Sequence, residues 1–158
     1  MNTLKNEKLI IVGYGNHSSV ITEAAILMGY KNIDYIVTDK SEPISIDGKT
    51  ITNELPINYL GNFFIAIGQN YLREKLYKEF IFKNPKSKFI RIIHPKSYIS
   101  SSAKVDEGSV ILPNAVIHTG CHIKRGVIIN INCHVDHNTI VEEFSSLSPS
   151  STIGGNSW

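Results

Sequence analysis

The chain is poor in several features whose absence excludes whole classes of protein. It has only two cysteines among its 158 residues, Cys121 and Cys133, which are too few for the disulfide framework of a small secreted domain. The longest aliphatic or aromatic runs, such as residues 63–67, are five residues long, whereas a membrane-spanning helix needs about 20. The N-terminal apolar stretch, residues 9–12, is shorter than the roughly 7 to 15 residues of a signal-peptide core. We therefore expect a cytoplasmic protein with no membrane segment.

An excess of charge of one sign is also missing. The 16 Lys and Arg residues nearly balance the 14 Asp and Glu residues, which leaves a formal net charge of +2. The basic residues are scattered, whereas a nucleic-acid-binding protein concentrates them in a patch or stripe. A hydrophobic content of 42% with 19% charged residues is typical of a folded soluble chain. We expect no nucleic-acid partner.

A six-residue period organises the chain from residue 99 onward. The first position of all ten hexads is a branched aliphatic residue: Ile99, Val105, Ile111, Ile117, Ile123, Ile129, Val135, Val141, Leu147 and Ile153. The fifth position is small or compact throughout: Ala103, Ser109, Ala115, Cys121, Val127, Cys133, Thr139, Ser145, Ser151 and Ser157. A two-site pattern held over the whole stretch indicates a repeat architecture.

This period favours a parallel β-helix. An α-helix with 3.6 residues per turn would rotate a six-residue stripe away from any one face. An ordinary antiparallel domain would need hairpin turns, and residues 99–158 contain neither Asn-Gly nor Asp-Gly. In a β-helix three hexads make one triangular coil, so residue i lies beneath residue i+18 at the strand spacing of about 4.7–4.9 Å. Cys121 and Cys133 then face inward, where a thiol is inert.

The N-terminal half alternates strands with helices. We expect strands over residues 8–12, 33–37, 63–67 and 89–93, with helices from the turn after residue 13 to Gly29 and from residues 68–70 to about residue 83. The stretch 41–60 is rich in turn residues and ambiguous. This order predicts a small parallel α/β sheet with right-handed crossovers.

The carboxyl ends of parallel strands bind ligands, and here one of them carries a glycine-rich turn. Gly13 and Gly15 would let backbone amides approach a phosphate at the start of the following helix. Ser18 stands where the dinucleotide fingerprint has a third glycine, which weakens an NAD interpretation. A turn without a ligand is a second interpretation. We favour a nucleotide or nucleotide-sugar site, in which Asp39 faces a ribose or base.

Four segments carry a resemblance to a known family. They are the glycine and histidine turn GYGNH, the stretch FFIAIGQN followed by Leu72 and Arg73, the stretch RIIHPKSYISSSAKV, and the hexapeptide segment GVIININCHVDHNTIVEEFSSLSPSSTIGG. They resemble the NeuD/PglD family of sugar acyltransferases, above all the bacterial N-acetyltransferases of nucleotide-linked 4-amino sugars. The resemblance implies a Rossmann-like nucleotide-sugar domain over residues 1–94 and a short left-handed parallel β-helix over residues 95–158.

The resemblance also implies the substrates, the assembly and the site residues. The expected activity is acetyl transfer from acetyl-CoA to the 4-amino group of a UDP- or dTDP-linked 4-amino-4,6-dideoxy sugar, in a homotrimer with its active site between subunits and without a metal. His137 falls on the family's catalytic histidine, with Asp136 before it, and Asn130 on an asparagine near the substrate or acetyl-CoA. The nucleotide-sugar site falls on Gly13, Gly15, His17, Asp39, Gly68 and Asn70.

The repeat supports His137 independently. It is the third residue of its hexad, so its side chain points to the outside of the β-helix, and 137 + 18 = 155 places Gly155 beside it. A neutral histidine can accept the proton of an attacking amine, and the Gly155 amide can stabilise an oxyanion. A surface histidine without a role is the alternative, as is a cross-rung pair of His118 with Asp136, since 118 + 18 = 136.

Other functions stay open at this point. The same base can activate a hydroxyl, which gives O-acetylation of a sialic-acid-type sugar. The chain stops at Trp158 after one strand of its fourth coil, whereas family members usually continue, and this favours a non-catalytic nucleotide-sugar-binding protein as another reading. A zinc site from His118, His122, His134 and His137 is a further possibility, although no register brings three of them together. We expect His122 and His134 to pack at faces or at the trimer seam.

Overall fold

The computed structural model describes residues 7–37, 44–46 and 49–158, and the chain divides into two compact units. The first ends at Phe89 and the second is Ile90–Trp158. We expected the second unit to begin at residue 95. It begins earlier because Ile92 and Ile93 pair in parallel with Val110 and Ile111 of the β-helix, so the six-residue period starts one strand before residue 99.

The first unit is the expected small α/β domain. Its elements are β1 (Lys8–Val12), α1 (Asn16–Met28), β2 (Asn32–Ile36), β3 (Ile44–Ile46), β4 (Lys49–Ile51), β5 (Asn62–Ile65), α2 (Asn70–Lys83) and β6 (Lys88–Phe89). Four of the strands form a parallel sheet in the order β2-β1-β5-β6. The ambiguous stretch contributes the antiparallel pair β3-β4. Neither α1 nor α2, the helices of the described ranges, has the length and apolar character needed to cross a bilayer.

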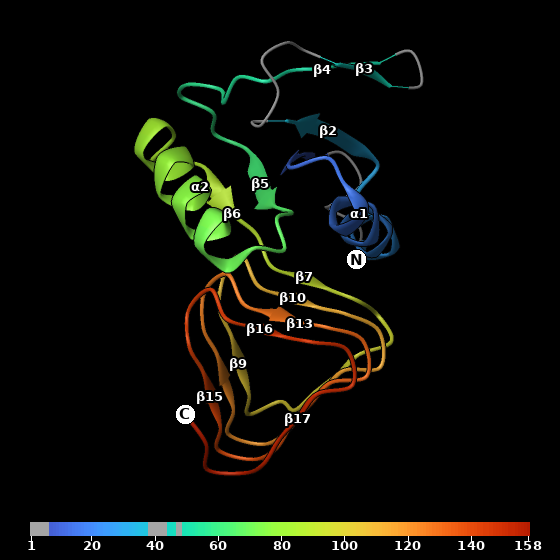
Figure 1. Ribbon diagram of the computed structural model, residues 1–158, viewed down its shortest axis with the longest axis vertical. Coiled ribbons are helices and arrows are strands. Elements are labelled where there is room, and N and C mark those ends of the chain that lie inside the picture. Colours follow the sequence, from blue (N-terminus) through green and yellow to red (C-terminus); the bar gives the residue numbers. More distant parts are fainter. Residues whose placement is uncertain (1–6, 38–43, 47–48) are drawn as a thin grey trace. The chain divides into compact units, whose positions relative to one another are not determined.

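The strand order creates a crevice between β1 and β5. The connection from β1 to β2 runs outward in one direction, and that from β5 to β6 runs outward in the other. Right-handed crossovers then place α1 and α2 on opposite faces of the sheet, as Figure 1 shows. The loops that follow β1 and β5 therefore diverge, which leaves a crevice at their carboxyl ends.

Aromatic and aliphatic side chains hold this sheet to α2. Phe63 of β5 stacks on Phe80 of α2 with ring centroids 4.0 Å apart and on Phe89 of β6 with centroids 4.8 Å apart. All three rings are buried. Such ring pairs stabilise by about 0.5–1.5 kcal/mol beyond the burial of their area. The packing fixes the C-terminal half of α2 against the sheet.

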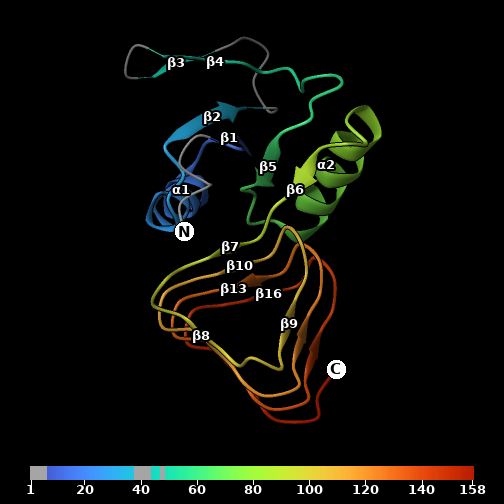
Figure 2. The same ribbon diagram turned by 180° about the vertical axis from the view of Figure 1, so that it is seen from behind.

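The second unit is a parallel β-helix of two-residue strands. They are β7 (Ile92–Ile93), β8 (Tyr98–Ile99), β9 (Lys104–Val105), β10 (Val110–Ile111), β11 (Val116–Ile117), β12 (His122–Ile123), β13 (Ile128–Ile129), β14 (His134–Val135), β15 (Ile140–Val141), β16 (Ser146–Leu147) and β17 (Thr152–Ile153). They form three parallel sheets, β7-β10-β13-β16, β8-β11-β14-β17 and β9-β12-β15. Every pair joins residue i to residue i+18, as predicted. The coils have a triangular outline in Figure 1 and Figure 2.

The interior of the β-helix explains both positions of the repeat. The aliphatic first positions from Val105 to Leu147 are buried in one cluster. Several fifth positions also use a small polar group, which donates a hydrogen bond to the carbonyl fifteen residues later. These donors are Ser109 to Lys124 O (2.7 Å), Cys121 to Asp136 O (3.0 Å), Cys133 to Ser148 O (3.1 Å) and Thr139 to Gly154 O (3.0 Å). Side chains at the fifth position thus satisfy corner carbonyls from inside.

The fourth position of the hexad carries a second constraint that the sequence reading missed. The backbone there is left-handed at each corner from residue 108 to residue 156: Gly108, Asn114, Gly120, Gly126, Asn132, Asn138, Phe144, Ser150 and Asn156. Glycine and asparagine adopt this conformation at least cost. Their recurrence every six residues is therefore a signal of the corners, visible in the sequence once the register is known.

Two strand predictions need correction. Residues 89–93 do not form one strand, because Phe89 ends β6 in the α/β sheet and Ile92 begins β7 in the β-helix. The strand predicted over residues 63–67 is β5, which ends at Ile65, so Ile67 lies in the loop that lines the crevice. Both errors arise where an apolar run continues through a change of partner. The predicted combination of an α/β domain and a β-helix is confirmed.

Candidate active site

The first candidate site is the crevice between the loops after β1 and β5. A cavity of about 270 Å³ is lined by Gly13, Tyr14, Gly15, Asn16, His17, Ala66, Ile67, Gly68 and Leu72. Four predicted residues, Gly13, Gly15, His17 and Gly68, therefore meet at one place. Asn70 begins α2 just beyond it. Asp39 lies outside the described residues.

Gly13 keeps the two walls of the crevice close together. Its φ is +114°, and a Cβ atom there would lie 2.9 Å from Cδ1 of Ile67 and 3.0 Å from the carbonyl oxygen of Ala66. Only glycine fits both the conformation and the space. Residue 13 thus sets the width of the crevice rather than its chemistry.

The free backbone donors of the crevice differ from those we expected. The Gly13 N–H donates to Ile36 O (2.7 Å), and the Gly15 N–H donates to Oγ of Ser18 (2.8 Å). Both glycine amides are therefore occupied. Among the described residues, the backbone N–H groups of Asn16 and His17 in the first turn of α1 have no partner. The positive end of the helix dipole adds to their attraction for an anion.

His17 brings an unsatisfied polar atom to the crevice. Its Nε2 is buried and has no hydrogen-bond partner among the described residues. Burial lowers the pKa of His17, and the positive charge of Arg73 lowers it further. The ring is therefore neutral at physiological pH, and it holds a buried nitrogen ready for a ligand.

Arg73 holds the loop after β5, which forms the second wall of the crevice. Its side chain is 1% exposed, and Nη1 donates to the carbonyl oxygens of Ile67 (2.9 Å) and Gly68 (3.1 Å), while Nη2 donates to Oδ1 of Asn70 (2.9 Å). Burial lowers its pKa to about 10, so it remains a cation at neutral pH. The arginine both shapes the 67–70 loop and gives the crevice a fixed positive charge.

The sequence reading assigned no role to Arg73 itself, although a signal was present. Arg73, Leu76 and Phe80 are spaced three and four residues apart and form the buried residues of α2. An arginine in register with the apolar face of a helix is buried, and a buried arginine needs several acceptors. Such a residue is a candidate for a structural or electrostatic role at a nearby site.

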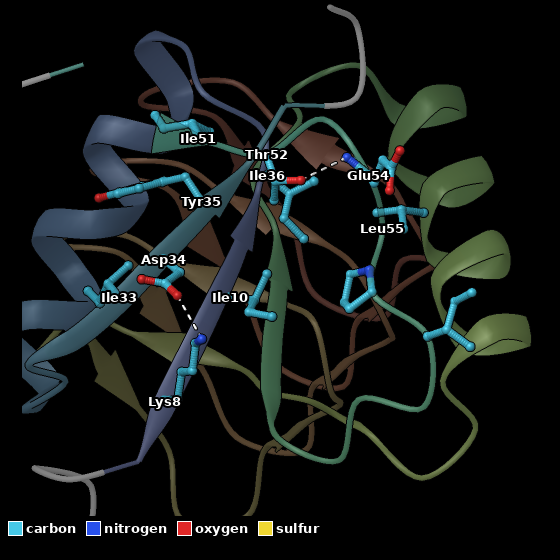
Figure 3. A pocket seen from close by; sticks show the side chains of 12 residues that line it. Lys8, Ile10, Ile33, Asp34, Tyr35, Ile36, Ile51, Thr52, Glu54 and Leu55 are labelled. Atoms are coloured by element: carbon cyan, nitrogen blue, oxygen red, sulfur yellow. Dashed lines mark hydrogen bonds and ion pairs between the residues drawn. The ribbon is translucent and has the colours of Figure 1, made fainter. Parts of the chain in front are cut away.

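A larger cavity, of about 600 Å³, lies against β1, β2 and the segment 51–57. Figure 3 shows the Lys8–Asp34 ion pair at one end, Thr52 and Glu54 at the other, and Ile10 between them. Its lining is mostly aliphatic. It contains none of the predicted site residues, so size alone does not identify the site.

The second candidate site lies on the β-helix, at the corner between β14 and β15. His137 is exposed there, and Gly155 lies one coil further on. A Cβ atom on residue 155 would lie 2.6 Å from Nε2 of His137, so an alanine there would displace the imidazole from this position. The Gly155 N–H has no partner among the described residues. The predicted pairing of a base with a free amide is therefore geometrically available.

Asp136 serves the backbone and not the ring. Its Oδ1 accepts a hydrogen bond from the backbone N–H of His137 (2.7 Å). His118 and Asp136 lie one coil apart in the 18-residue register, but no hydrogen bond joins their side chains in the described part of the chain. The side chain that does face the imidazole is Asn138, with Nδ2 3.4 Å from Nδ1 of His137.

The remaining predicted residues of the β-helix have no hydrogen bond to His137 among the described residues. Oδ1 of Asn130 accepts the N–H of Ile131 (2.9 Å) after β13. His122 is bonded through Nε2 to Oδ2 of Asp106 (2.7 Å). Burial acts to raise the pKa of Asp106, but hydrogen bonds from His122 and Lys104 outweigh it and lower the pKa. His134 is exposed. No group of three or more metal-binding side chains occurs within the described ranges.

Comparison with known proteins finds relatives of both units of the chain. The sequence model of the PglD N-terminal domain family matches residues 8–80. The acetyltransferase domain of PglB from Neisseria gonorrhoeae is 30% identical, with a TM-score of 0.81 over 93% of this chain and 73% of that chain. The same domain in complex with acetyl coenzyme A gives 27% identity and a TM-score of 0.80 over the same shares.

Two further structures extend the comparison. PerB from Caulobacter crescentus, in complex with CoA and GDP-perosamine, is 25% identical, with a TM-score of 0.85 over 99% of this chain and 76% of that chain. WeeI from Acinetobacter baumannii, at 16% identity and a TM-score of 0.75 over 94% of this chain and 73% of that chain, shares the fold. The likeness spans both units in each case.

Proposed function

This chain belongs to the PglD/NeuD-type family of sugar N-acetyltransferases, and we propose that it moves the acetyl group of acetyl-CoA to the 4-amino group of a UDP- or dTDP-linked 4-amino-4,6-dideoxy sugar. Such a reaction supplies acetylated sugars for glycan or polysaccharide synthesis. The observation that carries the proposal is the His137 imidazole seated on Gly155, whose N–H is free. A base and an oxyanion donor are what acyl transfer to an amine requires.

The crevice of the α/β unit has the groups needed to bind the diphosphate of a nucleotide-linked substrate. Free N–H groups at Asn16 and His17 and the charge of Arg73 favour an anion. The buried Nε2 of His17 offers one further polar atom to the ligand. PerB, a structure 25% identical to this chain, holds CoA and GDP-perosamine, which is a nucleotide-linked amino sugar. We assign Gly13, Gly15, His17, Gly68 and Asn70 to this nucleotide-sugar site.

The chemistry follows from the corner residues. The neutral 4-amino group attacks the thioester carbonyl, and Nε2 of His137 takes the proton that the nitrogen loses. The Gly155 N–H donates to the oxyanion of the tetrahedral intermediate. The intermediate then expels the CoA thiolate, which recovers a proton from the imidazolium. The base contributes about 10²–10⁴-fold and the amide about 10²–10³-fold.

The burial of both cysteines favours direct attack of the amine on acetyl-CoA within a ternary complex. Cys121 and Cys133 are both buried inside the β-helix, and each Sγ donates to a carbonyl oxygen. A buried thiol so engaged is a poor nucleophile. We therefore propose direct transfer, without an acyl-cysteine intermediate, and place Asn130 near the acetyl-CoA.

A homotrimer would complete the site. His137 is exposed in the single chain, whereas base catalysis gains strength where water is excluded. A neighbouring copy would supply the missing wall, and we propose that the active site forms between subunits.

Thiol release from acetyl-CoA tests the proposal. The assay uses UDP-, dTDP- and GDP-linked 4-amino-4,6-dideoxy sugars, the matching 4-hydroxy sugars, sialic acid and a no-acceptor control. Release that requires the amino sugar supports N-acetylation, and release with sialic acid alone would assign O-acetylation instead. Binding of UDP without binding of acetyl-CoA or release from any acceptor would overturn the transferase and favour a nucleotide-sugar-binding protein.

A further inference from the structure

A further cavity of the α/β unit shares a wall with the crevice. It has a volume of about 360 Å³ and lies between α1 and Tyr35 of β2, and we call it the α1–β2 cavity. Tyr14 lines both this cavity and the crevice. A ligand whose anionic end is held in the crevice can therefore extend past Tyr14 into the α1–β2 cavity.

Tyr14 offers an aromatic ring that is held in place without a ligand. The residue is 40% exposed, and its ring meets the ring of Tyr35 edge to face, with centroids 5.1 Å apart and an interplanar angle of 89°. The hydroxyl of Tyr35 is hydrogen-bonded in turn to Oγ1 of Thr22 (3.0 Å). Because these contacts already restrict the Tyr14 side chain, a flat group that stacks on it pays little for ordering the ring.

The glycine turn leaves open space beside Tyr14. A Cβ atom added to Gly15 would meet nothing within 4 Å beyond its chain neighbours, whereas one added to Gly13 would collide with Ile67 and Ala66. The turn is therefore closely packed on one side of Tyr14 in the sequence and open on the other. Room for a ligand lies at Gly15, where the crevice meets α1.

The crevice and the α1–β2 cavity are spaced like the parts of a nucleotide. The free N–H groups of the crevice are those of Asn16 and His17 in the first turn of α1. The α1–β2 cavity is lined further along the same helix, by Ser19, Thr22 and Glu23 among others. A rise of 1.5 Å per residue places Thr22 about 9 Å beyond Asn16 along the helix axis. A ribose and its base extend over a comparable length from the phosphate that they carry.

The polar groups of the α1–β2 cavity match the edge of a pyrimidine that has a ring N–H. Glu23 is exposed and lines this cavity, and a carboxylate accepts hydrogen bonds but donates none. Ser19 and Thr22 add hydroxyl groups, which can donate to carbonyl oxygens. Uracil and thymine carry one N–H between two carbonyl oxygens, whereas cytosine has a bare ring nitrogen at that place, which a carboxylate repels.

We propose that the α1–β2 cavity binds the base of the nucleotide, that the base stacks on Tyr14, and that Glu23 selects uracil or thymine by accepting the ring N–H. This inference rests on the proposed function, because it takes the crevice as the site of the diphosphate. Every base has a flat face, so Tyr14 contributes affinity. The edges of the bases differ, so Glu23 contributes the choice among them.

Calorimetric titration of the full chain with UDP, CDP and inorganic pyrophosphate tests the base site without turnover. Tyr14→Ala should weaken UDP binding by about 10-fold and leave pyrophosphate binding unchanged, because pyrophosphate has no base to stack. Tyr14→Phe keeps the ring and should bind UDP as the original chain does. Phe82→Ala is the matched control, since Phe82 is an 88% exposed aromatic residue of α2 that lines neither cavity. It should bind all three ligands normally.

Glu23→Gln tests the choice of base. The original chain should bind UDP more tightly than CDP, and the glutamine variant should reduce this preference by about 10-fold, because its amide can donate to the bare ring nitrogen of cytosine. Binding of pyrophosphate should change little. A preference that Glu23→Gln leaves unchanged would remove Glu23 from the site.

NMR of the UDP complex reads the stacking directly. Nuclear Overhauser effects should join the ring protons of Tyr14 to H5 and H6 of uracil, and they should be lost in Tyr14→Ala at saturating UDP. Effects that join Tyr14 to no base proton would overturn the proposal. So would equal losses of UDP and pyrophosphate binding in Tyr14→Ala, because the tyrosine would then only shape the turn.

The outcomes separate this inference from the proposed function. UDP binding that depends on Tyr14, in a chain that acetylates no acceptor, would support the base site while the transferase falls. Acetyl transfer to a nucleotide-linked amino sugar, with a UDP affinity that Tyr14→Ala leaves unchanged, would overturn the base site alone. Binding of neither UDP nor pyrophosphate would overturn both the base site and the crevice as the nucleotide site.

Discussion

The candidate sites of the two units differ in how the sequence brings their residues together. In the β-helix, residue i lies beside residue i+18 at every coil, so the partner of His137 follows from counting. In the α/β unit, the crevice joins a turn after β1 to a loop after β5 and to Arg73 from α2, and no period relates them. At the exposed corner of the β-helix, the position of the His137 ring depends on the space above Gly155. In the crevice, the position of the 67–70 loop depends on the buried charge of Arg73.

This difference predicts how substitutions should affect each site. Substitutions at the corner should change the space available to the His137 ring. They should leave the rest of the β-helix in place, since each coil contacts only its neighbours. Substitutions in the crevice should act through hydrogen bonds and charge, because the Arg73 side chain and Nε2 of His17 are buried.

The largest effect should come from His137→Ala. Because the ring is exposed, its loss should not change the free energy of unfolding, while turnover should fall by about 10²–10⁴-fold. The measurement is kcat for acetyl transfer together with the affinity for the nucleotide sugar, which should be unchanged if the crevice binds it. Turnover retained in a folded variant would remove the corner from the mechanism.

A stability effect in the β-helix should follow from Gly126→Ala. Gly126 has φ +68°, and an added Cβ would collide with the ring of Phe144 one coil further on. Left-handed strain and overpacking together should cost about 2–5 kcal/mol. Denaturant unfolding with hydrogen exchange across residues 90–158 measures the loss.

Gly154→Ala is the matched control for that substitution. Its backbone is not left-handed, and no atom lies within 4 Å of an added Cβ, so its free energy of unfolding should stay close to that of the original chain. Equal losses in both variants would mean that the corner geometry is not the cause.

In the α/β unit, Arg73→Met should loosen the 67–70 loop. Methionine fills similar space but leaves Ile67 O, Gly68 O and Asn70 Oδ1 without the donors they have. An acceptor left unpaired in a buried place costs about 1–3 kcal/mol. Hydrogen exchange should rise in this loop, and affinity for a nucleotide diphosphate should fall more than affinity for the nucleoside. Equal losses for both ligands would argue against a role for the charge.

The smallest effect concerns pH and His17. Because its pKa in the folded chain lies below its ordinary value, the unfolded chain binds more protons between those two values, and the free energy of unfolding must decrease as the pH falls through them. His17→Gln should reduce this decrease between about pH 7 and pH 5. His118→Gln, at an exposed position, should not. A steeper decrease in His17→Gln would contradict the assignment.

Most of the β-helix site could be predicted from the sequence, whereas most of the crevice could not. Counting placed Gly155 beside His137, but it offered Asp136 as a partner of His118, whereas the carboxylate bonds to the backbone N–H of His137. The glycine turn after β1 was recognised, but its free amides are those of Asn16 and His17. In both cases the sequence indicates which residues gather, and the local hydrogen bonds decide which atom is left free.

The six-residue period is enough to specify the β-helix, because three hexads to a coil bury the aliphatic first positions from Val105 to Leu147, and the same geometry places residue i beside residue i+18. The sequence also determined the alternation of strands and helices in the first unit. Three features come from tertiary packing: the boundary between β6 and β7, the burial of Arg73 beneath the crevice, and the position of Asn138 beside His137. Those features depend on the direction of single side chains and on the competition of donors for acceptors, which no spacing in the sequence records.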